Sequence, residues 1–145
     1  MSESIQHEQC LRGAEAYIRE LAALRADIVV YRDVREALPG SRPPLIGGFR
    51  PDIFIRLWQD SSFFIGEAKS AGDITSPRTR SQIAAFLAEV ERDPLGNLVL
   101  CVPFTEVPTA RALLSELGAY NAAVGSRVFC IAPNFSTIDQ AVLVK

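Results

Sequence analysis

Residues 50–69 have the sequence RPDIFIRLWQDSSFFIGEAK, and this stretch decides the fold. Two apolar runs, 53–57 and 63–65, flank a short polar segment, a pattern typical of a β-hairpin. Asp52 lies near the start of the first strand, and Glu67 lies near the end of the second. Because those two ends are neighbours in an antiparallel pair, we expect the two carboxylates to converge across 67 − 52 = 15 positions of sequence.

Lys69 extends this acidic pair. Because side chains alternate along a strand, Glu67 and Lys69 project from one face of the hairpin and Ala68 from the other. Two carboxylates and an ammonium are suited to holding a hard divalent cation beside a phosphate. The alternative is a structural ion pair at a strand end. Without a metal the carboxylates repel, which raises one pKa, so we hypothesise that Asp52→Ala abolishes metal binding and leaves stability unchanged or higher.

Length and composition limit the remaining possibilities. The chain has 145 residues, 48% of them hydrophobic and 22% charged, which predicts a single globular domain with a sizeable core. Its net charge of −2 excludes a global basic field, so any binding of nucleic acid must come from a local patch. The cysteines, Cys10, Cys101 and Cys130, form no CxxC motif and are expected to be buried thiols rather than zinc ligands. The start of the chain lacks a signal-peptide pattern, and no apolar run reaches membrane-spanning length, so we expect a cytoplasmic protein.

Helices and strands alternate along the rest of the chain. Ser76 and Pro77 are start signals for a helix over 77–92. The other expected elements are a helix over 4–26, strands over 27–32, 97–102 and 127–132, a helix over 108–118 with Ala112, Leu113 and Leu117 inward, and an edge strand or short helix over 138–144. Since helix–strand alternation implies a parallel crossover, we predict an α/β fold, a mixed central sheet flanked by helices on both sides.

Several charged residues outside the hairpin admit two interpretations. The Pro- and Gly-rich stretch 36–50 is either a plain surface loop or a flap that carries Arg42 and Arg50 toward a phosphate backbone. Arg78 and Arg80 lie in the first turn of the helix that starts at Pro77, where they oppose the helix dipole. A phosphate at that end would offset this cost; the alternative is ordinary exposed arginines.

Glu15 is similarly ambiguous. If each residue of the first helix turns about 100°, Glu15 lies about 40° outside the edge of the apolar stripe. It is either a solvated residue on the helix flank or it leans over the rim of the core toward the carboxylates.

The hairpin motif resembles that of a known superfamily. Pro51-Asp52 followed by Glu67-Ala68-Lys69 resembles the signature of the PD-(D/E)xK nucleases, whose restriction-endonuclease-like fold has an αβββαβ core. Gln82 resembles the helix glutamine that many members carry after the lysine. Glu15 resembles the first-helix acid of the archaeal Holliday-junction-resolvase-like branch. The resemblance covers roughly residues 10–132.

This resemblance implies a Mg²⁺-dependent endodeoxyribonuclease, in which Mn²⁺ can replace Mg²⁺. Asp52, Glu67, the carbonyl of Ala68 and Glu15 would hold the metal. Lys69 would orient the attacking water and stabilise charge on the phosphate, and Gln82 would position the backbone or the water.

The arginines named above are the expected contacts to DNA: Arg42, Arg50, Arg78 and Arg80. The competing interpretation is a catalytically silent module that keeps the fold and acts by binding protein or nucleic acid. A homodimer or a partner protein would then supply target recognition, since the chain has few spare elements for it. RNA as the substrate, the shape of the substrate and the biological pathway stay open.

Overall fold

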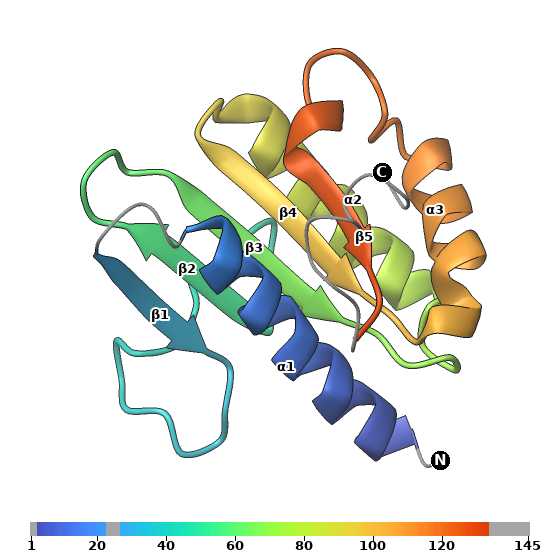
Figure 1. The fold of residues 1–145 in the computed structure, drawn as a ribbon, viewed down its shortest axis with the longest axis horizontal. Helices are drawn as coiled ribbons and strands as arrows, with labels where there is room; N and C mark the ends of the chain where they lie inside the picture. Colours follow the sequence, from blue (N-terminus) through green and yellow to red (C-terminus); the bar gives the residue numbers. More distant parts are fainter. Residues whose placement is uncertain (1–2, 23–26, 134–145) are drawn as a thin grey trace.

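The predicted hairpin forms and leads into a five-stranded sheet (Figure 1). The structure is a computed structural model that describes residues 3–22 and 27–133. The strands, in their spatial order, are β1 (Ile28–Arg32), β2 (Ile53–Leu57), β3 (Phe63–Ala68), β4 (Gly96–Cys101) and β5 (Val128–Ile131). The β1–β2 and β2–β3 pairs are antiparallel, and the β3–β4 and β4–β5 pairs are parallel. The predicted mixed sheet is therefore confirmed.

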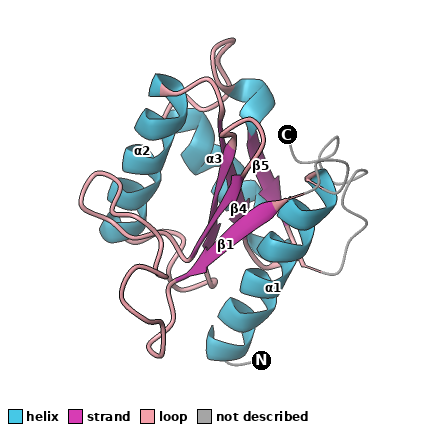
Figure 2. Ribbon diagram, turned by 90° about the vertical axis from the view of Figure 1, so that its left-hand side faces the viewer, coloured by secondary structure: helices cyan, strands magenta, loops and turns pink. Residues whose placement is uncertain are grey.

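Helices cover both faces of this sheet (Figure 2). α1 (Glu3–Leu21) packs on one face, and α2 (Pro77–Arg92) and α3 (Val107–Glu116) pack on the other. Short 3₁₀ turns at Phe104–Glu106 and Gly125–Arg127 precede α3 and β5. The fold class is the expected one: an α/β architecture in the order α-β-β-β-α-β, extended by α3 and β5.

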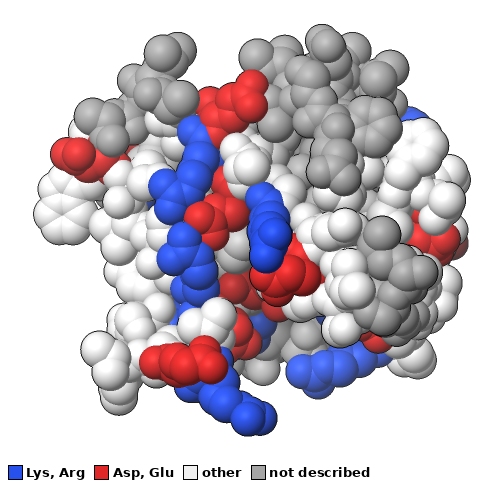
Figure 3. Space-filling model, turned by 60° about the horizontal axis from the view of Figure 1, so that its bottom comes forward, with Lys and Arg blue, Asp and Glu red and all other residues white. Residues whose placement is uncertain are grey.

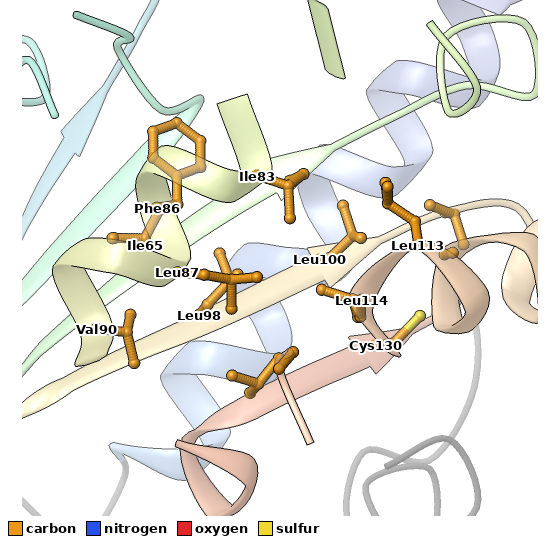
Figure 4. Close-up of a cluster of buried hydrophobic side chains, with 14 of the residues drawn as sticks. Ile65, Ile83, Phe86, Leu87, Val90, Leu98, Leu100, Leu113, Leu114 and Cys130 are labelled. Carbon is orange, nitrogen blue, oxygen red and sulfur yellow. The ribbon is translucent and has the colours of Figure 1, made fainter. Parts of the chain in front are cut away.

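Each face of the sheet has its own apolar core. On the α1 face, Tyr17 and Ile18 are fully buried against strand residues that include Ile55. On the other face, α2 and α3 pack against alternate residues of β3, β4 and β5, as the labelled side chains of Figure 4 show. Adjacent strand residues therefore belong to opposite cores, Ile65 to one and Phe64 to the other. This alternation decides which helix each polar residue of the hairpin faces.

The start of α2 is the predicted one. The Ser76 hydroxyl oxygen accepts a hydrogen bond from the N–H of Thr79 at 3.1 Å, and Pro77 is the first helical residue. This N-cap satisfies one of the free donors of the first turn. The apolar residues of α2 pack on the sheet, and the helix buries Gln82 together with Ile83 and Phe86.

The inward face of α3 differs from the prediction. Leu113 is buried and Leu117 is partly buried against the core, as expected, but Ala112 is exposed. Ala110 and Leu114 take the inward positions instead. Only Ala112 was assigned to the wrong face, because small residues mark the face of a helix weakly.

The Pro- and Gly-rich connection between β1 and β2 is anchored on α2. Ile46 and Phe49 exchange backbone hydrogen bonds of 2.7 and 3.0 Å around Gly47 and Gly48, which have φ of +60° and +85°. A Cβ on Gly47 would lie 2.7 Å from the Cβ of Ala85, so the turn needs glycine for both its conformation and its close approach. Ile46 is 7% exposed and belongs to the core of that face.

Some predictions fall outside the described residues. The end of the predicted helix 4–26 beyond residue 22 and the tail over 138–144 are among them. All three cysteines are buried and free, as predicted. In the described part of the chain, none of the helices combines the length and the apolar character needed to cross a bilayer.

Candidate active site

The hairpin brings Asp52 and Glu67 together. The backbone N–H of Asp52 donates to Oε1 of Glu67 at 3.0 Å, and the N–H of Ala68 donates to Oδ2 of Asp52 at 2.9 Å. Asp52 directly precedes β2, and Glu67 lies in β3, where the antiparallel register places Ile53 opposite Gly66. The expected convergence of the two carboxylates is therefore present in the structure.

Lys69 and Gln82 complete a connected group. Nζ of Lys69 lies 3.3 Å from Oε2 of Glu67 and donates to Oε1 of Gln82 at 2.6 Å. Ala68 points into the opposite core, against α1, as the strand alternation predicts. Four side chains from the hairpin, the strand end and α2 thus form one network.

The choice of lysine at this position is itself informative. Of the 15 basic residues of the chain, 13 are arginines, and only Lys69 and Lys145 are lysines. The side chain of Lys69 is 13% exposed. A compact ammonium with three rotatable donors can serve a carboxylate, an amide and a third oxygen, whereas the planar guanidinium of arginine favours flat, paired acceptors.

The electrostatics of the two carboxylates are opposite. Glu67 is 2% exposed, and burial together with the charge of Asp52 raises its pKa well above the ordinary value, against the smaller opposing effect of Lys69. Burial also opposes the ionised form of Asp52, but hydrogen bonds from His7 and from the N–H of Ala68 outweigh it and hold its pKa below the ordinary value. Without a further cation, Asp52 therefore loses its proton at a lower pH than Glu67 does.

His7 is a site residue that the sequence analysis missed. Its Nε2 lies 3.6 Å from Oδ2 of Asp52, and the interaction with that carboxylate raises the pKa of the imidazole. A signal was present in the sequence. His7 precedes Cys10 and Leu11 by three and four residues, so it extends the apolar stripe of α1 toward the hairpin end.

Glu15 points toward arginines. Its two carboxylate oxygens accept hydrogen bonds from Arg32 at 2.8 and 2.6 Å and from Arg19 at 3.0 Å. The bond to Arg32 is the largest influence that lowers the pKa of Glu15. Glu15 shares a cavity wall with Asp52 but makes no recorded contact to it. Its carboxylate is directed to Arg32 and Arg19 rather than to Asp52, and metal binding by Glu15 stays a prediction.

The four arginines proposed to contact DNA have partners within the protein. Nη2 of Arg42 donates to the carbonyl of Arg35 at 3.3 Å, and Arg50 donates to the carbonyl of Pro43. The guanidinium of Arg78 lies 5.4 Å from the centre of the Phe49 ring, and Arg80 pairs with Glu116 at 2.7 Å. On the face shown in Figure 3, basic and acidic side chains interleave rather than form a uniform basic surface.

A divalent cation fits the donor set of this site. Asp52 and Glu67 supply carboxylates, and the peptide of Ala68 is held against Asp52 by its own N–H. Within residues 3–22 and 27–133, no three His, Cys, Asp or Glu side chains are grouped closely enough to bind a metal ion by themselves. An ion held here would need oxygens of other kinds, which suits Mg²⁺ because it retains several waters in its protein sites.

Comparisons with known proteins give a structural match alone. No protein-family model and no curated protein sequence matches the chain. Among solved structures, the fold is similar to MunI restriction endonuclease, determined in complex with cognate DNA. The alignment covers 96% of this chain and 93% of that one, with 15% sequence identity and a TM-score of 0.44. This similarity concerns the overall fold and not the side chains of the site.

Proposed function

We propose that the chain is a Mg²⁺-dependent nuclease that hydrolyses phosphodiester bonds of DNA. The observation that carries the proposal is the pairing of two carboxylates with opposite pKa shifts at one hairpin end, beside a buried lysine. Strongly shifted pKa values on adjacent carboxylates beside a buried ammonium are enriched at functional sites.

Asp52 and Glu67 would hold the metal, with the carbonyl of Ala68 as a further ligand. A bound divalent cation polarises the phosphodiester and neutralises charge that develops on it. Lys69 would stabilise the same negative charge and orient the attacking water, and the contacts of its ammonium with Glu67 and Gln82 support this role. Gln82 holds the lysine in that position and keeps an amide N–H₂ group for the substrate backbone or the water.

One observation favours a second candidate, a catalytically silent module with the same fold. Glu67 is 2% exposed, and both of its oxygens have partners, the N–H of Asp52 and the ammonium of Lys69. A structural ion pair at a strand end would have the same appearance. The nuclease hypothesis therefore requires that metal displace the proton that Glu67 favours, and this requirement can be measured.

The first test is calorimetric titration with Mg²⁺ and with Mn²⁺. We expect wild-type protein to bind either ion, and Glu67→Gln to lose binding, since an amide cannot replace the charge of a carboxylate. Glu91→Gln is the matched control, because Glu91 is exposed on α2 and distant in sequence from the site. Equal binding by Glu67→Gln and Glu91→Gln would remove Glu67 from the metal site.

The second test is cleavage of linear, supercoiled, branched and single-stranded DNA, and of RNA, with Mg²⁺ or Mn²⁺. We expect metal-dependent cutting of at least one DNA substrate, and its loss in Lys69→Ala. Metal binding without cutting of any substrate by the wild-type protein would favour the silent module. Cutting that survives in Lys69→Ala would contradict the role given to that residue.

A further inference from the structure

A cavity opens beside the hairpin end, between α1 and the strands β1 and β2. Its volume is about 430 Å³, within the range of about 300–1,000 Å³ typical of small-molecule sites. Leu11 and Ala16 of α1 and Ile53 of β2 supply an apolar lining. Asp52 also lines it, so the cavity and the candidate active site share one carboxylate.

The walls of this cavity carry charges of both signs, already matched to one another. Arg32 and Arg19 both donate to Glu15, and the Arg12–Glu8 pair, at 3.4 Å, lies one helical turn further along α1. Counting every charged lining residue, three arginines face four carboxylates. A free phosphate or another compact anion would meet those carboxylates at close range. A neutral ligand with both hydrogen-bond donors and hydrogen-bond acceptors would avoid this repulsion.

A nucleobase has this chemistry. It is neutral and planar, its edge presents donors and acceptors together, and its faces are apolar enough to stack on aliphatic groups and on guanidinium planes. A base within a duplex cannot enter a cavity of this kind, because its edge is paired and its faces are stacked. An unpaired base can, and the phosphate attached to it would then lie on the side of Asp52.

We propose that this cavity binds the base of an unpaired nucleotide next to the phosphodiester to be cut, so that the preferred substrate is single-stranded or locally unpaired DNA. The inference rests on the proposed function, since it identifies the substrate class of that same site. Arg32 is the expected base contact, because it lies on the cavity wall in a fixed orientation through two hydrogen bonds to Glu15, of 2.8 and 2.6 Å.

The test fills the cavity without altering the site. Ala16→Phe places a ring in the cavity from an exposed position of α1, where the substitution disturbs no core contact. Ala88→Phe is the matched control, an exposed alanine of α2 that belongs to no cavity wall described above. Circular dichroism and thermal denaturation confirm that both variants fold.

The probe is a single-stranded DNA oligonucleotide with one 2-aminopurine, titrated by fluorescence in EDTA, beside its perfectly paired duplex. We expect wild-type protein to bind the single strand at least about tenfold more tightly than the duplex, the scale of one lost base-stacking contact. Ala16→Phe should remove at least about tenfold of that single-strand affinity, and Ala88→Phe should leave it unchanged.

Three outcomes would overturn the inference: equal or tighter binding of the duplex, no binding of the single strand, or equal affinities of the two variants. Because the titration contains no metal, its result is independent of the calorimetric test of the metal site. Ala16→Phe should also bind Mn²⁺ as the wild type does. Loss of metal binding in that variant would mean that the ring had disturbed Asp52 rather than blocked a base.

Discussion

The buried contact between Glu67 and Lys69 leads to a prediction that a double-mutant cycle can test. The variants are Glu67→Gln, Lys69→Met and the pair together, all measured without metal at about pH 8. Removing the lysine leaves a carboxylate that is 2% exposed without its counter-charge. We expect a loss of about 3–5 kcal/mol in the free energy of unfolding, the range for breaking one side of a buried ion pair.

The double variant should recover most of that loss. It removes both charges, so the remaining cost is the hydrogen bond that Lys69 donates to Gln82, about 1 kcal/mol. With Glu67→Gln close to neutral by itself, the coupling energy between the two positions should therefore be about 2–4 kcal/mol, at the upper end of the range for residues in one network.

The pH dependence of stability gives a second, independent test of the same contact. Burial and Asp52 raise the pKa of Glu67 in the folded state above its ordinary value of 4.5. A group with a raised folded pKa contributes its stability fully below the unfolded pKa and loses it as pH rises through the folded pKa. Stability of the metal-free wild type should therefore fall from about pH 4.5 upward, more steeply in Lys69→Met, and this component should be absent in Glu67→Gln.

The assay is urea denaturation in EDTA at about pH 5 and about pH 8, with a check that the m-value is constant so that midpoints report stability. Glu91→Gln is again the control for a glutamate that is exposed. A cost for Lys69→Met below about 1 kcal/mol, or one that is the same at both pH values, would refute the reasoning.

Three further predictions concern single contacts. Asp52→Ala should destabilise the metal-free protein by about 1–3 kcal/mol in thermal denaturation, because the buried N–H of Ala68 loses its acceptor; this replaces the expectation of unchanged or higher stability that the sequence suggested. Ser76→Ala should cost about 0.5–2 kcal/mol by urea denaturation, because α2 loses its N-cap. Glu15 has a lowered pKa chiefly through Arg32, so its stabilisation is present above its ordinary pKa of 4.5 and is lost as pH falls through the folded value. Melting temperatures of Glu15→Gln should accordingly depend less on acid than those of the wild type.

The hairpin and its face assignment could be predicted because both follow from local rules. A polar turn between two apolar runs sets the pairing, and the period of two decides that Glu67 and Lys69 share a face. Gln82 was singled out by the resemblance of the motif to a known superfamily, while its contact with Lys69 depends on how α2 packs on the sheet.

Other contacts could not be derived from the sequence, because they depend on how far a helix lies from a strand. Glu15 meets Arg32 across 32 − 15 = 17 positions, and nothing local distinguishes this partner from the other arginines. The apolar stripe of α1 includes His7, but only the docking of the helix onto the sheet decides that its end reaches Asp52.

The helices on the two faces of the sheet contact different residues of the site. α1 supplies His7, which favours the ionised form of Asp52, while α2 supplies Gln82, which holds Lys69 beside Glu67. Glu67 favours its proton because one ammonium does not offset burial and a neighbouring carboxylate together. A divalent cation would add the missing positive charge, so its binding, the release of that proton and the stability of the fold are linked. The position of each covering helix on the sheet would therefore influence metal affinity, α1 through His7 beside Asp52 and α2 through Gln82, which holds Lys69 beside Glu67.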